Sequence, residues 1–174
     1  MKNNLFDQAY AIMKASFPES ERRTYDGQKA LLSDPHYRLE AETDSNDRLI
    51  SFIAAWEFPS LRFVEHLAVD PDIRGGGIGG KMMRAYMGEC STPVVLEVEP
   101  PDTQIAIRRV SFYKRLGFHL NPFDYRQPPL QQGHSDLPLK LMSYPSPLKE
   151  FEFVRYREIL YNLVYKVKPL KKGE

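Results

Sequence analysis

Five glycines fall within the six positions 75–80, and they constrain this chain more than any other feature of its sequence. A strand-like segment at 61–69 precedes them, and a helically spaced apolar stripe follows at 78–87. Each glycine costs a helix about 1 kcal/mol relative to alanine, so this composition favours a backbone that approaches a ligand closely. Amides at a helix N-terminus bind phosphate oxygens, and an arginine adds charge and donors. We therefore predict a pyrophosphate site formed by Arg74, Gly75, Gly76, Gly77, Ile78, Gly79 and Gly80.

Two common phosphate-binding motifs match this segment only in part. Residues 75–80 have the G-x-G-x-x-G spacing of the dinucleotide fingerprint, with Glu97 as the acidic residue, but the polar or turn-forming residues 70–74 separate them from the strand. With Lys81 the glycines also approach a P-loop, but Met82 stands where a hydroxyl would hold magnesium. Neither a dinucleotide-dependent oxidoreductase nor an NTPase is therefore favoured.

The periodicity of apolar residues divides the rest of the chain into helices and strands. Three strands between 37 and 69, joined by short links, predict an antiparallel meander, and a strand–helix–strand unit at 61–99 predicts a parallel crossover. The sequence therefore predicts an α+β fold, with mixed α/β layers around one central, mostly antiparallel twisted sheet. The predicted helices lie at 4–16, 24–33, 78–87, 103–116 and 147–166, and the predicted strands at 37–41, 48–58, 61–69, 94–98, 118–125 and 137–144.

Length and composition narrow the class of protein. A chain of 174 residues favours one domain, and a net charge of +1 gives no reason to expect nucleic acid or an acidic membrane as partner. The single cysteine, Cys90, excludes an intrachain disulfide, and the four histidines lack the spacing of metal ligands. No segment is apolar enough for a signal peptide or a membrane span, so we expect a cytoplasmic protein without a metal.

Two motifs in order give the chain a family resemblance. Residues 67–79, LAVDPDIRGGGIG, resemble motif A of the GNAT superfamily of acyl-CoA-dependent N-acyltransferases. Residues 111–118, SFYKRLGF, resemble that superfamily's second motif, in which a tyrosine on a helix precedes a glycine–phenylalanine entry into the next strand. The resemblance covers about residues 50–120. Two positions depart from the family pattern. Ala106 stands where the family often has an asparagine, seven residues before the tyrosine, and Arg109 stands where a small residue is common.

The resemblance implies a fold and a co-substrate. It implies a GNAT-like arrangement within one domain, 1–174, of which 126–174 forms a C-terminal loop–strand–helix extension of the common core. It also implies that acetyl-CoA binds to the phosphate loop. The pantetheine arm would bind backbone groups of a strand that splays from its neighbour, at Leu67, Ala68 and Val69.

The resemblance further points to residues for the chemistry. An amine that attacks a thioester must lose a proton, and the leaving thiolate benefits from gaining one. Tyr113 is the implied donor, because a phenol with a pKa of about 10 donates without ionising first. For the base we prefer Glu65, since strand alternation puts it on the same face as Leu67 and Val69, where a polar residue on an apolar face suggests a cavity.

Other candidates for the base stay open. His66 is predicted to point to the opposite face of the strand from Glu65, and it titrates near neutral pH. Glu97 and Glu99 share one face of the next strand, where they could hold a proton-relaying water or bind arginine side chains. In the fold that the resemblance implies, the charged loop at 19–23 borders the acceptor site.

These expectations combine into one function. The chain is predicted to be an N-acetyltransferase that moves an acetyl group from acetyl-CoA to a primary amine of a small molecule or a peptide. The alternative is an acyl-CoA-binding sensor or interaction module that has the same fold but no catalysis. The apolar C-terminal helix at 147–166 is expected to pack on its own domain, with a homodimer contact as the second interpretation.

Overall fold

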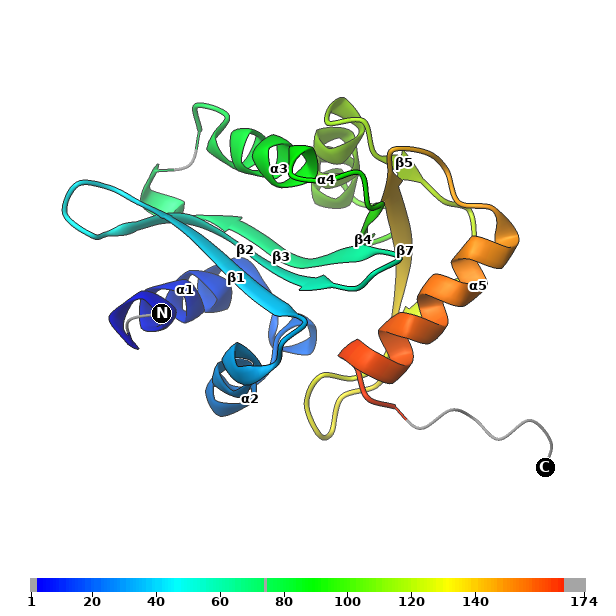
Figure 1. Cartoon of the computed structure of the whole chain (residues 1–174), viewed down its shortest axis with the longest axis horizontal. Helices are drawn as coiled ribbons and strands as arrows, with labels where there is room; N and C mark the ends of the chain where they lie inside the picture. Colours follow the sequence, from blue (N-terminus) through cyan, green and yellow to red (C-terminus); the bar gives the residue numbers. More distant parts are fainter. Residues whose placement is uncertain (1–2, 74, 168–174) are drawn as a thin grey trace.

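A seven-stranded sheet organises the computed structural model, which describes residues 3–73 and 75–167 (Figure 1). The strand order is β1-β2-β3-β4-β7-β5, and β6 pairs with β7. Among the ladders of the described residues, only β3–β4 is parallel. The main elements are α1 (Asn3–Ser16), α2 (Tyr25–Ala30), β1 (Tyr37–Thr43), β2 (Leu49–Glu57), β3 (Arg62–Val69), α3 (Ile78–Gly88), β4 (Val94–Val98), α4 (Gln104–Arg115), β5 (His119–Leu120), β6 (Tyr125–Gln127), β7 (Leu137–Tyr144) and α5 (Glu150–Ile159).

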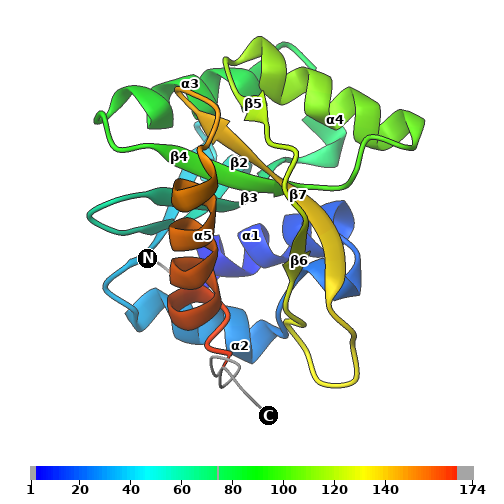
Figure 2. The ribbon, with the colours of Figure 1, turned by 90° about the vertical axis from the view of Figure 1, so that its right-hand side faces the viewer.

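Helices cover both faces of this sheet, as predicted. On one face Met13 of α1 and Phe153 of α5 belong to the same apolar cluster as Trp56 of β2. On the other face a second cluster contains Met83 of α3 and Val110 of α4. Figure 1 shows α3 and α4 above the sheet and α1 and α2 below it, and Figure 2 shows α5 alongside β7 and β6. The molecule is therefore an α+β sandwich of helices around one mostly antiparallel sheet.

The central strand β3 separates from β4 after a short ladder. Residues 62–64 pair in parallel with residues 94–96, and the ladder ends there. The whole of β4 pairs instead with β7 on its other side. The predicted meander and the predicted parallel unit at 61–99 are confirmed. The two strands of that unit, β3 and β4, diverge after their short ladder and form a fork.

A β-bulge lies on β3 close to the point where this fork opens. Ala54 of β2 pairs with His66, whereas Ala55 pairs with Val64, so Glu65 is an extra residue on β3. A bulge of this kind bends the strand and shifts the alternation of its side chains. The side chains before and after Glu65 therefore do not follow one continuous period of two.

The predicted strand at 118–125 is wrong as a single element. It consists of two short pieces, β5 and β6, because Pro122 has no amide to donate to a ladder. Between them Asn121 turns its side chain into the sheet, where Nδ2 donates to the carbonyl of Leu141 and to Ser143 Oγ at 3.0 Å each. This polar insertion interrupts the strand and fixes the chain against β7.

The C-terminal helix also differs from its prediction at both ends. It begins at Glu150 rather than Pro147, because the Lys149 amide donates to the Glu152 carboxylate at 2.8 Å and caps the helix there. At its far end α5 continues as a π-helical turn, Leu160–Val164. No helix in the described ranges is both long and apolar enough to cross a membrane.

Candidate functional site

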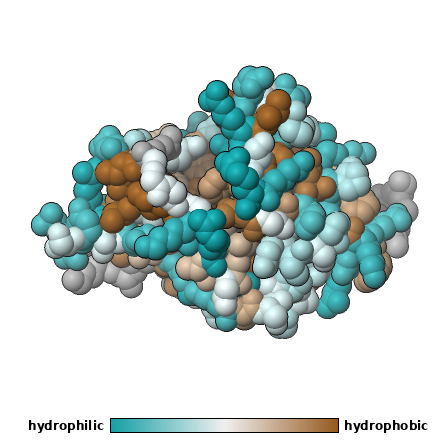
Figure 3. Space-filling model, turned by 90° about the horizontal axis from the view of Figure 1, so that it is seen from above, coloured by the Kyte–Doolittle hydropathy of each residue, from teal (hydrophilic) through white to brown (hydrophobic). Residues whose placement is uncertain are grey.

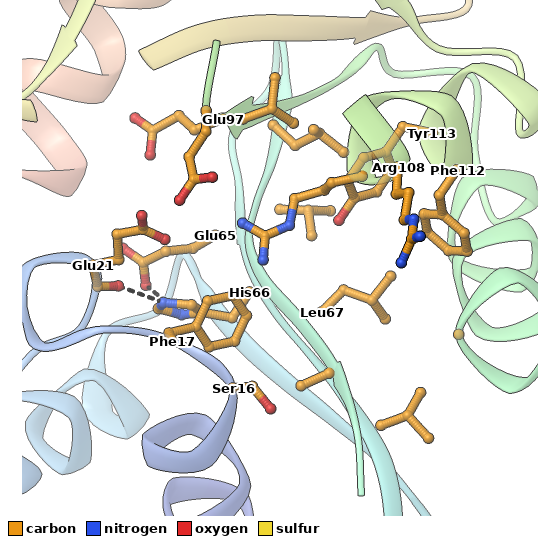
Figure 4. A pocket seen from close by; sticks show the side chains of 18 of the residues that line it. Ser16, Phe17, Glu21, Glu65, His66, Leu67, Glu97, Arg108, Phe112 and Tyr113 are labelled. Carbon is orange, nitrogen blue, oxygen red and sulfur yellow. Dashed lines mark hydrogen bonds and ion pairs between the residues drawn. The ribbon is translucent and has the colours of Figure 1, made fainter. Parts of the chain in front are cut away.

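The fork between β3 and β4 opens into a cavity of about 630 Å³. The first turn of α3, helix α4, the segment after α1, and strands β6 and β7 complete its walls. From above, hydrophilic side chains dominate the face of the molecule, with hydrophobic patches between them (Figure 3). Inside the cavity, acidic, aromatic and basic side chains converge from the separate elements (Figure 4).

One end of the cavity is formed by the glycine loop and the start of α3. Gly75, Gly76 and Gly77 have φ angles of 118°, 63° and 74°, which side-chain-bearing residues rarely adopt, and a Cβ added at any of them would meet no neighbouring atom within 4 Å. The first hydrogen bond of α3 runs from the Lys81 amide to the Gly77 carbonyl. The amides that precede Lys81 in the first turn therefore have no acceptor within the helix. This open loop therefore fits an anion such as a pyrophosphate. The predicted contribution of Arg74 lies outside the described residues.

The outer half of β3 runs directly beside this loop. Leu67, Ala68 and Val69 line the cavity on the part of the strand beyond the β4 ladder. Gly79 of α3 lies close to them, since a Cβ there would be in van der Waals contact with Val69 Cγ2 at 3.4 Å and with the Phe112 ring at 3.8 Å. The two segments predicted to bind the cofactor thus share one wall.

Tyr113 projects from α4 into the same cavity (Figure 4). The rings of Phe112 and Phe118 pack edge-on against it, with centroids 5.1 and 5.6 Å away. Burial raises the pKa of the Tyr113 phenol to about 12, so the hydroxyl keeps its proton at neutral pH. It makes no hydrogen bond to any residue in the described ranges. A protonated hydroxyl is therefore available to a ligand.

The bulge overturns the predicted orientation of Glu65. Alternation predicted that it would share a face with Leu67 and Val69, but the inserted residue turns its side chain to the opposite face of the sheet. There the carboxylate pairs with Arg23 at 2.6 Å, and only 3% of the Glu65 side chain and 11% of the Arg23 side chain are exposed. The guanidinium also lies 5.9 Å from the centre of the Trp56 ring. Glu65 is therefore a buried carboxylate whose charge is already neutralised.

His66 was predicted to face away from Glu65, but the bulge places the two side chains on the same face of the sheet. Its Nδ1 is 3.8 Å from Glu65 Oε2, and its ring packs edge-on against Phe17. Its Nε2 lies 2.8 Å from the carbonyl oxygen of Glu21, which only accepts, so Nε2 carries the proton. Burial lowers the pKa of the imidazole, which is therefore neutral at physiological pH.

Glu97 projects from β4 into the cavity and is held by two phenols (Figure 4). Tyr125 donates to its Oε1 at 2.5 Å, and Tyr165 lies 2.7 Å from both carboxylate oxygens. Burial raises the pKa of Glu97 to about 7, although the two hydrogen bonds oppose that rise. This carboxyl group can therefore take up and release a proton near neutral pH.

Further charges surround the end of the cavity away from the glycine loop. Burial and the carboxylate of Glu99 raise the pKa of Glu21, while Arg109 opposes that rise. All three side chains line the cavity, and Glu21 is the residue of the loop at 19–23 that does so. Within the described residues, no group of three or more His, Cys, Asp or Glu side chains is placed to hold a metal ion.

The two tyrosines on Glu97 were not singled out by the sequence. Tyr125 is the last residue of the predicted strand 118–125 and the first residue of β6. Tyr165 follows the π-helical turn, and its amide donates to the carbonyl of Leu160 at the end of that turn. Their spacing along the chain carries no motif. The available signal was Glu97 itself, because a carboxyl group on an otherwise apolar strand requires hydrogen-bond partners.

Comparison with known proteins reveals extensive similarity. Residues 35–120 match the family model described as "Acetyltransferase (GNAT) domain". The chain is 33% identical over 124 residues to the "Putative acetyltransferase YjbC" of Bacillus subtilis (strain 168), a match that covers 68% of this chain and 60% of that protein. The chain thus spans less than two thirds of the length of this relative.

Two solved structures extend the comparison. A "putative acetyltransferase from GNAT family" of Bacteroides thetaiotaomicron superposes with a TM-score of 0.87 at 32% identity and covers 95% of this chain and 94% of its own. An "aminoglycoside 6'-N-acetyltransferase complexed with coenzyme A" superposes with a TM-score of 0.59 at 17% identity, over 86% of this chain and 97% of its own. At that identity the second likeness extends to the fold alone.

Proposed function

Because the chain belongs to the GNAT family of acetyltransferases, we propose that it is an acetyl-CoA-dependent N-acetyltransferase that acts on a primary amine. One observation carries this proposal. A single cavity joins an open glycine loop at a helix N-terminus, a protonated buried phenol, and a carboxyl group that titrates near neutral pH. An anchor for a phosphate, a proton donor and a proton acceptor are the groups that such a reaction requires.

The cofactor end follows from the glycine loop and β3. We assign the pyrophosphate of acetyl-CoA to the loop at 75–77 and the first turn of α3, and its pantetheine arm to the backbone at Leu67, Ala68 and Val69. The solved aminoglycoside 6'-N-acetyltransferase, which shares the fold, was complexed with coenzyme A, and this supports the assignment. When bound, acetyl-CoA supplies an acetyl group on a thioester.

The transfer would form a carbon–nitrogen bond and break the carbon–sulfur bond. In this proposal Glu97 takes the proton that the amine must lose, because its affinity for protons is poised near neutral pH. Glu65, the base preferred from the sequence, is instead assigned to the cavity wall, since Arg23 neutralises it. Tyr113 gives its proton to the departing sulfur, because its hydroxyl keeps that proton and has no bond to another described residue.

The acceptor end favours a positively charged group. Glu21, Glu97 and Glu99 line the cavity and outnumber Arg108 and Arg109, the arginines in the same lining. Carboxyl groups attract an ammonium ion before it gives up its proton. The aminoglycoside enzyme is likewise named for an amine acceptor. A primary amine on a small molecule or a peptide is therefore the proposed class of acceptor.

Calorimetric titration of the purified protein tests the cofactor assignment. Acetyl-CoA is expected to bind, whereas NADH and ATP–magnesium, added as controls, are expected to bind far more weakly. The same preparation is then incubated with acetyl-CoA and a panel of amines, and the release of free CoA thiol is followed. Binding of NADH or ATP in place of acetyl-CoA would refute the proposal. Binding of acetyl-CoA with no amine-dependent CoA release would instead support the non-catalytic alternative.

A further inference from the structure

Both phenols that hold Glu97 come from the chain beyond the family match. The match ends at residue 120, whereas Tyr125 lies on β6 and Tyr165 follows the π-helical turn. Glu97 itself lies inside the matched region. The carboxyl group proposed to accept the proton is thus contributed by the common domain, and its hydrogen bonds are contributed by the C-terminal segment.

The fold directs these two hydroxyls to Glu97 by separate means. Strand β6 pairs with β7 in a register that sets Tyr125 opposite Leu139, which lines the cavity. The π-helical turn ends with a bond from the Tyr165 amide to the Leu160 carbonyl, and the wider turn changes the direction of the side chains that follow it. Arg23 Nη2 lies 3.4 Å from the Val164 carbonyl and anchors the end of this turn. Two elements distant in sequence therefore meet on one carboxyl group.

Both phenols act on Glu97 as donors. Burial and Glu97 raise the pKa values of Tyr125 and Tyr165 well above the usual value for a phenol, so both keep their protons at neutral pH. A donated hydrogen bond stabilises the carboxylate form, and it therefore counteracts the burial that favours the protonated form. The hydroxyls also fix the orientation of the carboxylate, with Tyr165 within 2.7 Å of both oxygens.

The other charged groups around Glu97 do not stabilise its carboxylate form as the two hydrogen bonds do. Glu65 of β3 and Glu21 of the segment after α1 raise its pKa, as like charges do. Arg23 faces the same region, but its charge is matched by Glu65. No ion pair in the described ranges includes Glu97. Arg108 and Arg109 of α4 line the same cavity, and neither forms an ion pair with Glu97 within the described residues. The two phenols are the groups whose hydrogen bonds lower the pKa of Glu97.

We propose that Tyr125 and Tyr165 are positioning residues, through which the C-terminal segment holds Glu97 ionised and oriented as the proton acceptor of the reaction. This inference rests on the proposed function for the role of Glu97. The hydrogen bonds themselves can be tested without it. The C-terminal segment then sets the pH range in which the enzyme works, in addition to contributing Gln127 and Leu139 to the cavity wall.

The test compares Tyr165→Phe with Tyr161→Phe. Tyr161 is a matched control, because its hydroxyl donates to the carbonyl of Arg126 and not to Glu97. The carboxyl stretch of Glu97 is titrated by infrared difference spectroscopy without substrate, and its band is identified by its loss in Glu97→Gln. Wild type should show a midpoint near pH 7. Tyr165→Phe should raise that midpoint by about one unit or more, since a hydrogen bond to a charged group is lost.

The pH dependence of kcat/KM should shift in the same direction as the Glu97 midpoint. An acceptor that works only when ionised loses activity as pH falls through its pKa, so the acid limb of kcat/KM should move to higher pH in Tyr165→Phe. The expected loss is about tenfold at pH 6, for a shift of one unit, and little at pH 9. Tyr161→Phe should follow the wild-type curve in both measurements.

An unchanged midpoint in Tyr165→Phe with a wild-type melting temperature would overturn the inference. If that variant fails to fold, Tyr125→Phe provides the same test, because its hydroxyl donates to the same carboxylate. A shifted midpoint in a protein that acetylates no amine would refute the proposed function while supporting the hydrogen-bonding role. A shifted midpoint with an unmoved acid limb would show that Glu97 is not the proton acceptor, and would also overturn the inference.

Discussion

Replacing Arg23 with methionine tests whether Glu65 is a structural part of the cavity wall. The ion pair between them is almost fully shielded from water, with a nitrogen–oxygen distance of 2.6 Å. Methionine keeps the apolar part of the side chain and removes the charge. The change therefore leaves a carboxylate buried and without its cation, which is the situation that proteins tolerate least.

The expected cost is large for a single substitution. Removing one partner of a buried ion pair costs about 3–5 kcal/mol. The loss of the guanidinium from above the Trp56 ring, at 5.9 Å, adds about 0.5–1 kcal/mol. For a chain of this size, the pair alone corresponds to a decrease in melting temperature of roughly 6–20 °C.

Urea unfolding at neutral pH measures the free energy directly, and two variants serve as controls. Arg126→Met removes an ion pair to Asp136 whose side chains are 54% and 50% exposed, so it should cost less than about 1 kcal/mol. The double variant Arg23→Met/Glu65→Met removes both charges and should recover at least half of the loss. A cost for Arg23→Met no greater than that for Arg126→Met would refute the buried pair, as would a double variant no more stable than Arg23→Met.

Three further predictions concern the cavity and the turn after α4. Tyr113→Phe should lower kcat by about 100-fold or more, with acetyl-CoA affinity by calorimetry nearly unchanged; unchanged turnover across an amine panel would remove Tyr113 from the mechanism. Gly77→Asp should weaken acetyl-CoA binding by about tenfold or more relative to Gly77→Asn, which has the same shape without the charge; equal affinities would show that the phosphate site is elsewhere. Gly117→Ala should destabilise the fold by about 1–3 kcal/mol in urea, because φ is 94° and the new Cβ would lie 3.3 Å from the Tyr144 ring; Gly88→Ala, in open space, should not, and equal stability of the two variants would contradict the strain.

Local sequence patterns predicted the elements that carry regular periodicity. The apolar spacing of α3 and α4 placed both helices within a few residues, and the three strands from 37 to 69 formed the expected meander. The glycines at 75–77 have positive φ angles, which glycine adopts more readily than any other residue type. These features are determined by the residues themselves, so the sequence was sufficient to identify them.

Features that depend on tertiary pairing were not predictable in this way. The bulge at Glu65 is defined by the register between β2 and β3, and the inserted residue moved Glu65 to the face on which His66 lies. The bond from Tyr165 to Glu97 joins residues far apart in the chain and depends on a π-helical turn at the end of α5. The sequence therefore singled out the glycine loop of the cavity, but not the contacts of Glu65 and Glu97.

The central claim is that this cavity transfers an acetyl group to an amine. The direct measurement incubates the protein with isotopically labelled acetyl-CoA and a panel of primary amines, and follows labelled products by mass spectrometry. The predicted result is an N-acetylated amine formed in equal amount to released CoA, with formation strongly reduced in Glu97→Gln and in Tyr113→Phe. If acetyl-CoA binds and no amine across the panel becomes labelled, the claim of catalysis is contradicted, and the chain is an acyl-CoA-binding member of its family.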